Sequence, residues 1–253
     1  MSTSMRTLTS KTISLRSVGT VVPLTAEAKA LTTRTARPER MTPLPNGAGL
    51  WLSGMGPVAA RNAAEALADA GATALAVFGV AGALQAGLRS GTLICPVRIF
   101  DDQGCDYTAD IPWRTRLVQR LTAAGLSAPA IGPLLSVAQP LLTASAKTAA
   151  GGLHAVAAVD MESAAVAAVA QARGLPFLAL RVIVDELDDT IPATLHACID
   201  AWGSPRPLKL IASLSRHPSL LTALPGLYSR MTRATRALRA VAQAATPTLG
   251  WDL

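Results

Sequence analysis

Three carboxylates, Glu27, Glu162 and Asp185, stand at positions from which they could do acid–base or sugar-binding chemistry. Each follows a strand-like apolar run or begins a helix-like segment, which is where α/β folds place groups that contact ligands. Glu162 could accept hydrogen bonds from sugar hydroxyls. Asp185 follows three β-branched residues, where partial desolvation would raise its pKa and make it a proton donor near neutral pH. Spacing alone leaves a second interpretation open, in which Glu162 and Asp185 are ordinary helix-start acids and Glu27 is a solvated first-turn residue.

Neither the glycines nor the cysteines indicate a cofactor or a metal. The segment SGMGPVAA, which contains Gly54 and Gly56, lacks the full dinucleotide-binding pattern, and GVAGAL lacks the GK[ST] ending of a phosphate loop. The three cysteines are an odd number without a close pair, so neither a disulfide framework nor a thiolate metal cluster is expected. The sequence therefore predicts no cofactor, no metal and a reducing, cytoplasmic environment.

The elements that must position the carboxylates form an α/β pattern. Half of the 253 residues are hydrophobic, which excludes a disordered chain. Apolar runs alternate with helix-like segments, and strands that are apolar on both faces indicate a sheet covered on both sides. The expected strands lie at 18–24, 51–52, 74–84, 92–100 and 134–137, with a last one ending at 185, and the expected helices lie at 25–31, 57–70 and 113–125; residues 154–174 are expected to form a strand that runs into a helix capped by Gly174. Residues 101–110 are expected to form a loop.

One uncharged run, residues 70–88, is long enough to meet the length threshold of a membrane-spanning helix. Gly79 and Gly82 argue against a continuous helix, because they fall where a buried strand would end. We therefore expect a strand followed by a tight turn at GVAGAL.

Charge divides the chain into a body and two basic ends. Lys and Arg outnumber Asp and Glu by 7 to 2 in residues 1–40 and by 7 to 1 in residues 204–253, whereas acids prevail by 13 to 9 between them. A basic groove through the fold is therefore not expected, and nucleic acid is not an expected partner. We predict a flexible basic tail (1–17), one catalytic-type domain (18–203) and a basic C-terminal helical extension (204–253). The tail has no apolar run of signal-peptide type, although an organellar transit peptide shares its composition.

The segment VDMESAAVAAVAQARGLPFLALRVIVD, at 159–185, closely resembles the signature of the nucleoside phosphorylase and nucleosidase superfamily. The resemblance extends to VGTVVPLTAEAKAL (18–31), SGMGPVAARNAAEAL (53–67) and FGVAGALQAGLRSGTLICPVRI (78–99), in the family order. It implies a three-layer α/β fold with a central mixed sheet flanked by helices, and a homo-oligomer.

The resemblance also implies roles for the matching residues. Glu162 would hold the ribose hydroxyls, and Met161 would pack against the sugar. Asp185 would protonate the five-membered ring of the purine as the glycosidic bond breaks, which agrees with the chemistry expected from its position. Glu27 matches the residue that activates water in hydrolytic members.

Two further positions are candidates for substrate contacts. Gly82 lies in the GVAGAL segment, and Arg181 matches a basic residue that precedes the catalytic acid. An ordinary ion pair with a nearby carboxylate would explain Arg181 equally well.

The chain departs from the phosphorolytic members at Val77 and Val80, where an Arg and a Ser usually bind phosphate. Apolar side chains cannot supply such bonds, so phosphate as a co-substrate would need other donors, such as the backbone amides of Gly54, Met55 and Gly56. At Val184 nucleosidases often have Ser, and a neighbour that cannot donate a hydrogen bond would leave Asp185 more readily protonated.

Two stretches, 141–163 and 181–192, are most similar to the hopanoid-associated phosphorylase branch, which implies release of adenine from adenosylhopane by phosphorolysis or hydrolysis. The alternatives are a methylthioadenosine/adenosylhomocysteine or futalosine nucleosidase, and a non-catalytic member that binds a membrane or a partner. Leucines alternate with basic residues in KLIASLSRHPSLLTALPGLYSRM, so the C-terminal segment could hold the protein at the inner face of a membrane. A solvated helix packed on the domain would fit the same pattern.

Overall fold

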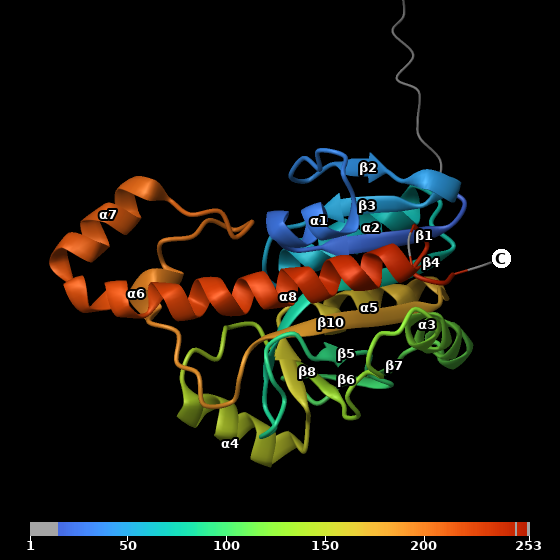
Figure 1. Ribbon diagram of the computed structural model, residues 1–253. Helices are drawn as coiled ribbons and strands as arrows, with labels where there is room; N and C mark the ends of the chain where they lie inside the picture. The colour runs from blue at the N-terminus through green and yellow to red at the C-terminus, as the bar shows by residue number, and fades with distance from the viewer. Residues whose placement is uncertain (1–14, 246, 252–253) are drawn as a thin grey trace, which may run out of the picture.

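The computed structural model describes residues 15–245 and 247–251, and it confirms the expected α/β architecture (Figure 1). A mixed sheet of ten strands forms the centre, with helices on both faces. The strands are β1 (Val18–Val22), β2 (Met41–Pro43), β3 (Gly49–Leu52), β4 (Ala74–Ala83), β5 (Leu93–Ile94), β6 (Arg98–Asp101), β7 (Asp106–Thr108), β8 (Leu134–Ser136), β9 (Ala158–Asp160) and β10 (Phe177–Asp185). The helices are α1 (Thr25–Leu31), η1 (Pro45–Gly47), α2 (Pro57–Asp69), α3 (Ile111–Ala123), α4 (Ala144–His154), α5 (Ser163–Arg173), α6 (Ala193–His196), α7 (Pro207–Arg216), η2 (Pro218–Thr222) and α8 (Leu224–Ala245).

The long strand β4 organises the sheet. It pairs in parallel with β1 on one side and with β10 on the other, and its last residues pair antiparallel with β9. The remaining strands extend the sheet in the order β2-β3-β1-β4-β9-β8-β6-β7, while β5 pairs with β10. Strands β1, β3 and β10 therefore end on the same side as β4, and the segments that follow them meet there, where folds of this kind bind ligands.

Helices cover the two faces with different side chains. On one face α2 and α5 contact each other and the sheet, mostly through buried alanines that allow close approach. On the other face α1, α3 and α8 pack over β10 and β1 around larger groups such as Phe78, Trp113 and Leu238. The two hydrophobic clusters hold the sheet rigid between them, so that it can position polar groups at its edge.

The strand expected at 74–84 is confirmed as β4, whereas the tight turn expected at GVAGAL is wrong, because β4 continues through Gly79 and Gly82 to Ala83. A Cβ at Gly79 would lie 2.5 Å from Glu27 Oε1 and 2.7 Å from Arg181 Nη1. The glycine therefore makes room for buried polar side chains and does not bend the chain. The run at 70–88 contains this strand, and none of the helices in the described part of the chain is long and apolar enough to cross a membrane.

Three other local expectations need correction. The single strand expected at 92–100 is two strands, β5 and β6, separated by a segment that contains Pro96, which has no N–H for a sheet. The expected loop at 101–110 contains β7, which forms an antiparallel hairpin with β6. Helix α4 was not expected, since its small residues carry little helical periodicity.

The terminal segments divide into parts inside and outside the body. Residues 1–14 of the N-terminal tail lie outside the described residues, whereas Leu15 and Ser17 are buried. In the C-terminal segment, α8 crosses the sheet face and α7 projects away from the body (Figure 1). The second half of α8 buries Ala234, Leu238 and neighbouring residues in the same cluster as β10 and α1. This half of the extension therefore completes the core.

Replacing Leu238 by Ala tests that conclusion. Leu238 is fully buried, so the variant should lose about 2–5 kcal/mol of unfolding free energy, from lost apolar burial and the cavity that remains. Urea-induced unfolding of the full chain measures this. The matched variant Arg236→Ala, on the exposed side of the same helix, should stay within about 0.5 kcal/mol of the wild type. Equal stability of both variants would contradict a structural role for α8.

Candidate active site

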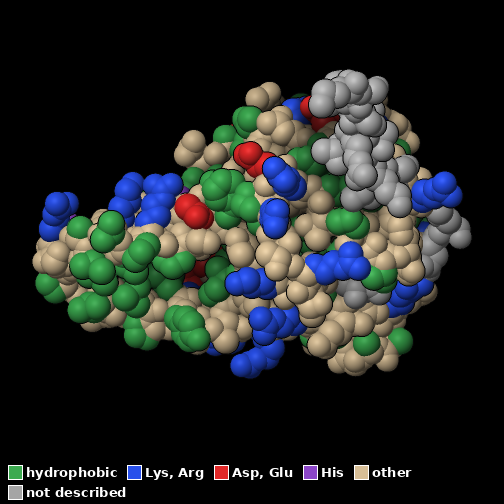
Figure 2. Space-filling model, turned by 90° about the horizontal axis from the view of Figure 1, so that it is seen from above, with side chains coloured by type: hydrophobic (Ala, Val, Ile, Leu, Met, Phe, Trp, Pro, Cys, Tyr) green, Lys and Arg blue, Asp and Glu red, His purple; other side chains and the backbone are tan. Residues whose placement is uncertain are grey.

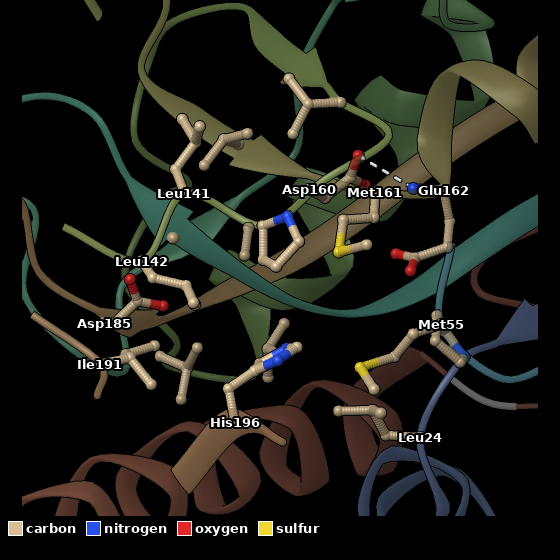
Figure 3. A pocket seen from close by; sticks show the side chains of 18 of the residues that line it. Leu24, Met55, Leu141, Leu142, Asp160, Met161, Glu162, Asp185, Ile191 and His196 are labelled. Carbon is tan, nitrogen blue, oxygen red and sulfur yellow. Dashed lines mark hydrogen bonds between the residues drawn. The ribbon is translucent and has the colours of Figure 1, made fainter. Parts of the chain in front are cut away.

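A cleft of about 210 Å³ opens where β1, β3, β9 and β10 end (Figure 3). It brings together most of the predicted site residues: Glu27, Met55, Gly82, Met161, Glu162 and Asp185 all line it. Asp185 and Glu162 lie on opposite sides of the cavity, and the side chain of Met161 lies between them near Glu162 (Figure 3). The rest of the wall is mainly apolar and includes Leu24, Leu141, Leu142, Ile191 and Ile199.

Glu162 is held rigidly at the N-terminus of α5. Its Oε1 accepts a hydrogen bond from the N–H of Gly56 at 2.9 Å, and its Oε2 accepts one from Arg181 Nη2 at 3.1 Å. Burial raises the pKa of Glu162, the Arg181 guanidinium opposes that rise, and the carboxylate of Asp160 adds to it. The carboxylate therefore has one fixed orientation at the cleft wall, as a sugar-binding acceptor requires.

Arg181 is fully buried behind Glu162 and is not among the residues that line the cleft. Its Nη2 lies 2.5 Å from Asp160 Oδ2, and Asp160 in turn accepts hydrogen bonds from Ser136 Oγ (2.6 Å) and from the N–H of Ser163 (3.2 Å). The ion-pair interpretation of Arg181 thus describes its observed contacts. Through Asp160 and Glu162, one guanidinium fixes both the end of β9 and the start of α5.

Glu27 occupies the first turn of α1. Its two carboxyl oxygens accept hydrogen bonds from the N–H groups of Leu24 and Val80, each at 2.7 Å. Burial raises the pKa of Glu27 to about 8, against the lowering effects of Arg181 and of the two N–H donors. A carboxyl group with this pKa can both lose and accept a proton near neutral pH.

Asp185 owes its direction to a bulge at the end of β10. Ile183 pairs with Ala81 and Asp185 with Gly82, so Val184 is the extra residue. Bulges re-aim side chains, and here the carboxylate faces Gly82, where a Cβ would lie only 3.0 Å from Asp185 Oδ2. Gly82 therefore leaves the space in which Asp185 can meet a ligand.

Lys147 forms an ion pair with Asp185, and sequence reasoning missed it. The side chain is fully buried, and its Nζ also donates to the carbonyls of Glu186 (2.8 Å) and Asp189 (3.0 Å). Burial raises the pKa of Asp185, and the charge of Lys147 opposes the rise. The signal in the sequence was the one lysine between residues 30 and 208, isolated in the small-residue run TASAKTAAGG.

His196 is the second residue that sequence reasoning missed. It stands on α6, lines the cleft and points into the cavity between the two carboxylates (Figure 3). Its imidazole adds a polar group to a wall that is otherwise mostly apolar on this side. The short helix α6 has no strong periodicity that would have marked it in the sequence.

The backbone amides expected to bind phosphate are engaged within the chain. The N–H of Gly54 donates to the Pro23 carbonyl (3.2 Å), that of Met55 to the Ala201 carbonyl (2.8 Å), and that of Gly56 to Glu162. A phosphate at these amides would have to displace those acceptors.

Comparisons with known proteins agree with the observed fold. A family model described as the phosphorylase superfamily matches residues 48–202. The fold is similar to that of futalosine hydrolase from Helicobacter pylori, with a TM-score of 0.63, 16% identity, and coverage of 90% of this chain and 98% of that one. The 5′-methylthioadenosine/S-adenosylhomocysteine nucleosidase from Neisseria meningitidis, in complex with methylthio-immucillin-A, gives a TM-score of 0.62 at 16% identity and the same coverage. No curated protein sequence matches the chain.

The raised pKa of Glu27 makes a prediction about stability. Folding lifts this pKa from about 4.5 to about 8, so the folded state holds the proton more tightly, and stability falls as pH rises through this range. Between pH 6 and pH 9 the wild type should lose about 2–3 kcal/mol relative to Glu27→Gln, which has no titrating group. Parallel urea-unfolding series at the two pH values measure the difference, and identical pH dependence of the two proteins would contradict it.

Proposed function

The chain belongs to the phosphorylase superfamily, and from that premise we propose that it hydrolyses the N-glycosidic bond of a purine nucleoside. The observation that carries the proposal is the arrangement of Glu162 and Asp185 on opposite sides of one cleft, with Glu27 beside them. Two carboxyl groups with different partners can hold a sugar and protonate a leaving base in the same cavity. Glu27 supplies a third group, which can accept a proton from water.

The roles follow from the contacts of each residue. Glu162 accepts hydrogen bonds from the ribose hydroxyls, and Met161 packs on the sugar. Asp185 gives its proton to the five-membered ring of the purine as the glycosidic bond breaks, so the base leaves neutral while the sugar becomes oxocarbenium-like. Water then adds to the sugar carbon, and Glu27 takes the proton that the water loses.

Water is favoured over phosphate as the nucleophile by two observations. Valine occupies both positions, Val77 and Val80, where phosphorolytic members carry phosphate-binding side chains. The three backbone amides that could replace those side chains already donate within the chain. A buried phosphate without charge-assisted hydrogen bonds would be strongly disfavoured.

For the substrate, we propose a nucleoside with a large apolar group on the sugar, and adenosylhopane is the leading candidate. The support is the apolar wall that surrounds the carboxylates, together with the resemblance of residues 141–163 and 181–192 to the hopanoid-associated branch. A cleft of about 210 Å³ suits the nucleoside part, and the lipid part would extend out of it. The second candidate is a small nucleoside, futalosine or methylthioadenosine, and it is favoured by the likeness in fold to hydrolases of those compounds.

Release of free purine tests the reaction and the substrate together. The full chain is incubated with adenosine, methylthioadenosine, futalosine and detergent-solubilised adenosylhopane, each with and without phosphate. We expect purine and a free sugar product without phosphate, fastest from adenosylhopane. Asp185→Asn should lower the rate by about 10²–10⁴-fold, because it removes the general acid. The matched variant Asp188→Asn, at an exposed position nearby, should keep full activity. A sugar phosphate as the product would overturn hydrolysis.

Lys147 should lower the pKa of Asp185 and so set the highest pH at which Asp185 still holds the proton that it donates. In Lys147→Met the carboxylate that forms in the transition state loses its counter-charge, so kcat should fall about tenfold or more while KM changes little. The same loss raises the pKa of Asp185, so activity should persist to higher pH than in the wild type. Lys29→Met, which removes an exposed lysine from α1, serves as the control. An unchanged alkaline limb of the pH–rate profile would contradict the assignment.

A further inference from the structure

A lobe formed by residues 193–230, comprising α6, α7, η2 and the first turns of α8, projects from the body at the end of the sheet where the cleft lies (Figure 1). None of the residues of α7 or η2 is buried. Of the nine large hydrophobic side chains that are exposed in the described part of the chain, four lie in this lobe: Leu208 (83% exposed), Ile211 (64%), Leu221 (54%) and Tyr228 (76%). Figure 2 shows apolar side chains gathered into one continuous patch on the lobe.

Helix α7 presents apolar groups on two sides. Leu210 and Leu214 are partly buried and face inward, whereas Leu208 and Ile211, three residues apart, face solvent. Lys209 and Arg216 share the remaining side, where both are exposed. A soluble monomer rarely exposes a continuous apolar patch of this kind, so the outward side marks an interaction surface.

The charges around the patch point to the chemistry of its partner. Between Asp200 and Asp252 the chain contains no acidic residue, while Arg206, Lys209 and Arg216 lie in the lobe. An amphipathic helix with apolar and basic sides lies in the interface of a membrane, where each basic residue near an anionic surface adds favourable electrostatic energy. Two copies of the lobe placed face to face would instead bring like charges together.

The lobe and the wall of the cleft form one hydrogen-bonded unit. The N–H of Arg206 donates to the Cys198 carbonyl at 2.7 Å, Cys198 Sγ donates to Ser213 Oγ of α7 at 3.3 Å, and Ile199 pairs with Pro205. Ile199 and His196 line the cleft. A surface that binds the lobe therefore lies close to the cleft.

We propose that the lobe is the docking surface for an anionic lipid bilayer, with Leu208 and Ile211 inserted among the acyl chains and the basic side chains at the headgroups. Docking places the cleft next to the membrane that would hold a lipid-linked nucleoside. The claim that docking brings the cleft to its substrate rests on the proposed function. The claim that the lobe binds a membrane rests only on the exposed apolar and basic side chains of the lobe.

Co-sedimentation with vesicles tests the docking. The full chain should bind vesicles made of equal parts phosphatidylglycerol and phosphatidylcholine. Its Kd for vesicles of pure phosphatidylcholine should be at least about tenfold higher. The double variant Leu208→Glu/Ile211→Glu should lose about tenfold or more of the affinity for the anionic vesicles. The matched double variant Ile131→Glu/Leu153→Glu adds the same charge at residues that are 91% and 80% exposed outside the lobe, and it should bind as the wild type does.

Two results would overturn the proposal: no binding of the wild type to anionic vesicles, or equal binding by the lobe variant. Size-exclusion chromatography of the same proteins can give a third contradicting result. If the wild type is an oligomer that does not bind vesicles, and the lobe variant is a monomer, the patch binds a second copy of the chain and not a membrane. Hydrolysis of water-soluble adenosine is measured in parallel and should be equal in the wild type and the two double variants. Lobe-dependent vesicle binding without any hydrolysis would refute the proposed function and leave the docking surface standing.

Discussion

The site depends on one buried cation, the guanidinium of Arg181. It lies among the carboxyl groups of Asp160, Glu162 and Glu27, all removed from water, and a charge in such a place is tolerable only when it is paired and hydrogen-bonded. Burial raises the pKa values of Glu27 and Glu162, and the neighbouring carboxylates add to the rise because the single charge of Arg181, which opposes it, cannot neutralise all three. The network therefore fixes the carboxylate of Glu162 at the cleft wall, while burial holds the pKa of Glu27 at about 8, where the group can take up or release a proton near neutral pH.

A second cation serves the other side of the cleft. Lys147, on α4, pairs with Asp185, which lies on the same strand as Arg181 but faces the opposite side of the cleft from Glu162. Arginine, which stays charged at any pH that a protein tolerates, suits the permanent anchoring of Glu162. A lysine ammonium is a compact charge, and here it opposes the rise in the pKa of Asp185 that burial causes, so different cations act on the carboxyl groups at the two sides of the cleft.

The sequence predicted the three carboxylates and the alternation of strands and helices, because both are local patterns. It could not predict the bulge at Val184 or the partner of Asp185, since these depend on residues that meet only in the folded chain. Gly79 illustrates the limit: in a linear pattern a glycine after a buried strand indicates a turn, yet its cause here is the approach of Glu27 and Arg181 from elsewhere in the chain. The shape of the apolar wall and the projection of the lobe were likewise beyond local patterns.

Helix α8 joins the projecting lobe to the buried core. Its 22 residues run without a break from the lobe to the core, a length of about 33 Å, and only its second half is packed beneath other elements. Its first half contacts loops near the cleft through Arg230. The Arg230 side chain forms an ion pair with Asp189 at 3.0 Å, and the Arg230 carbonyl accepts a hydrogen bond from Ser90 Oγ. Such a helix can pivot about its packed second half. A tilt of about 5° about the packed end would move the far end by about 3 Å, so a mechanical load on the lobe reaches the loop that follows Asp185.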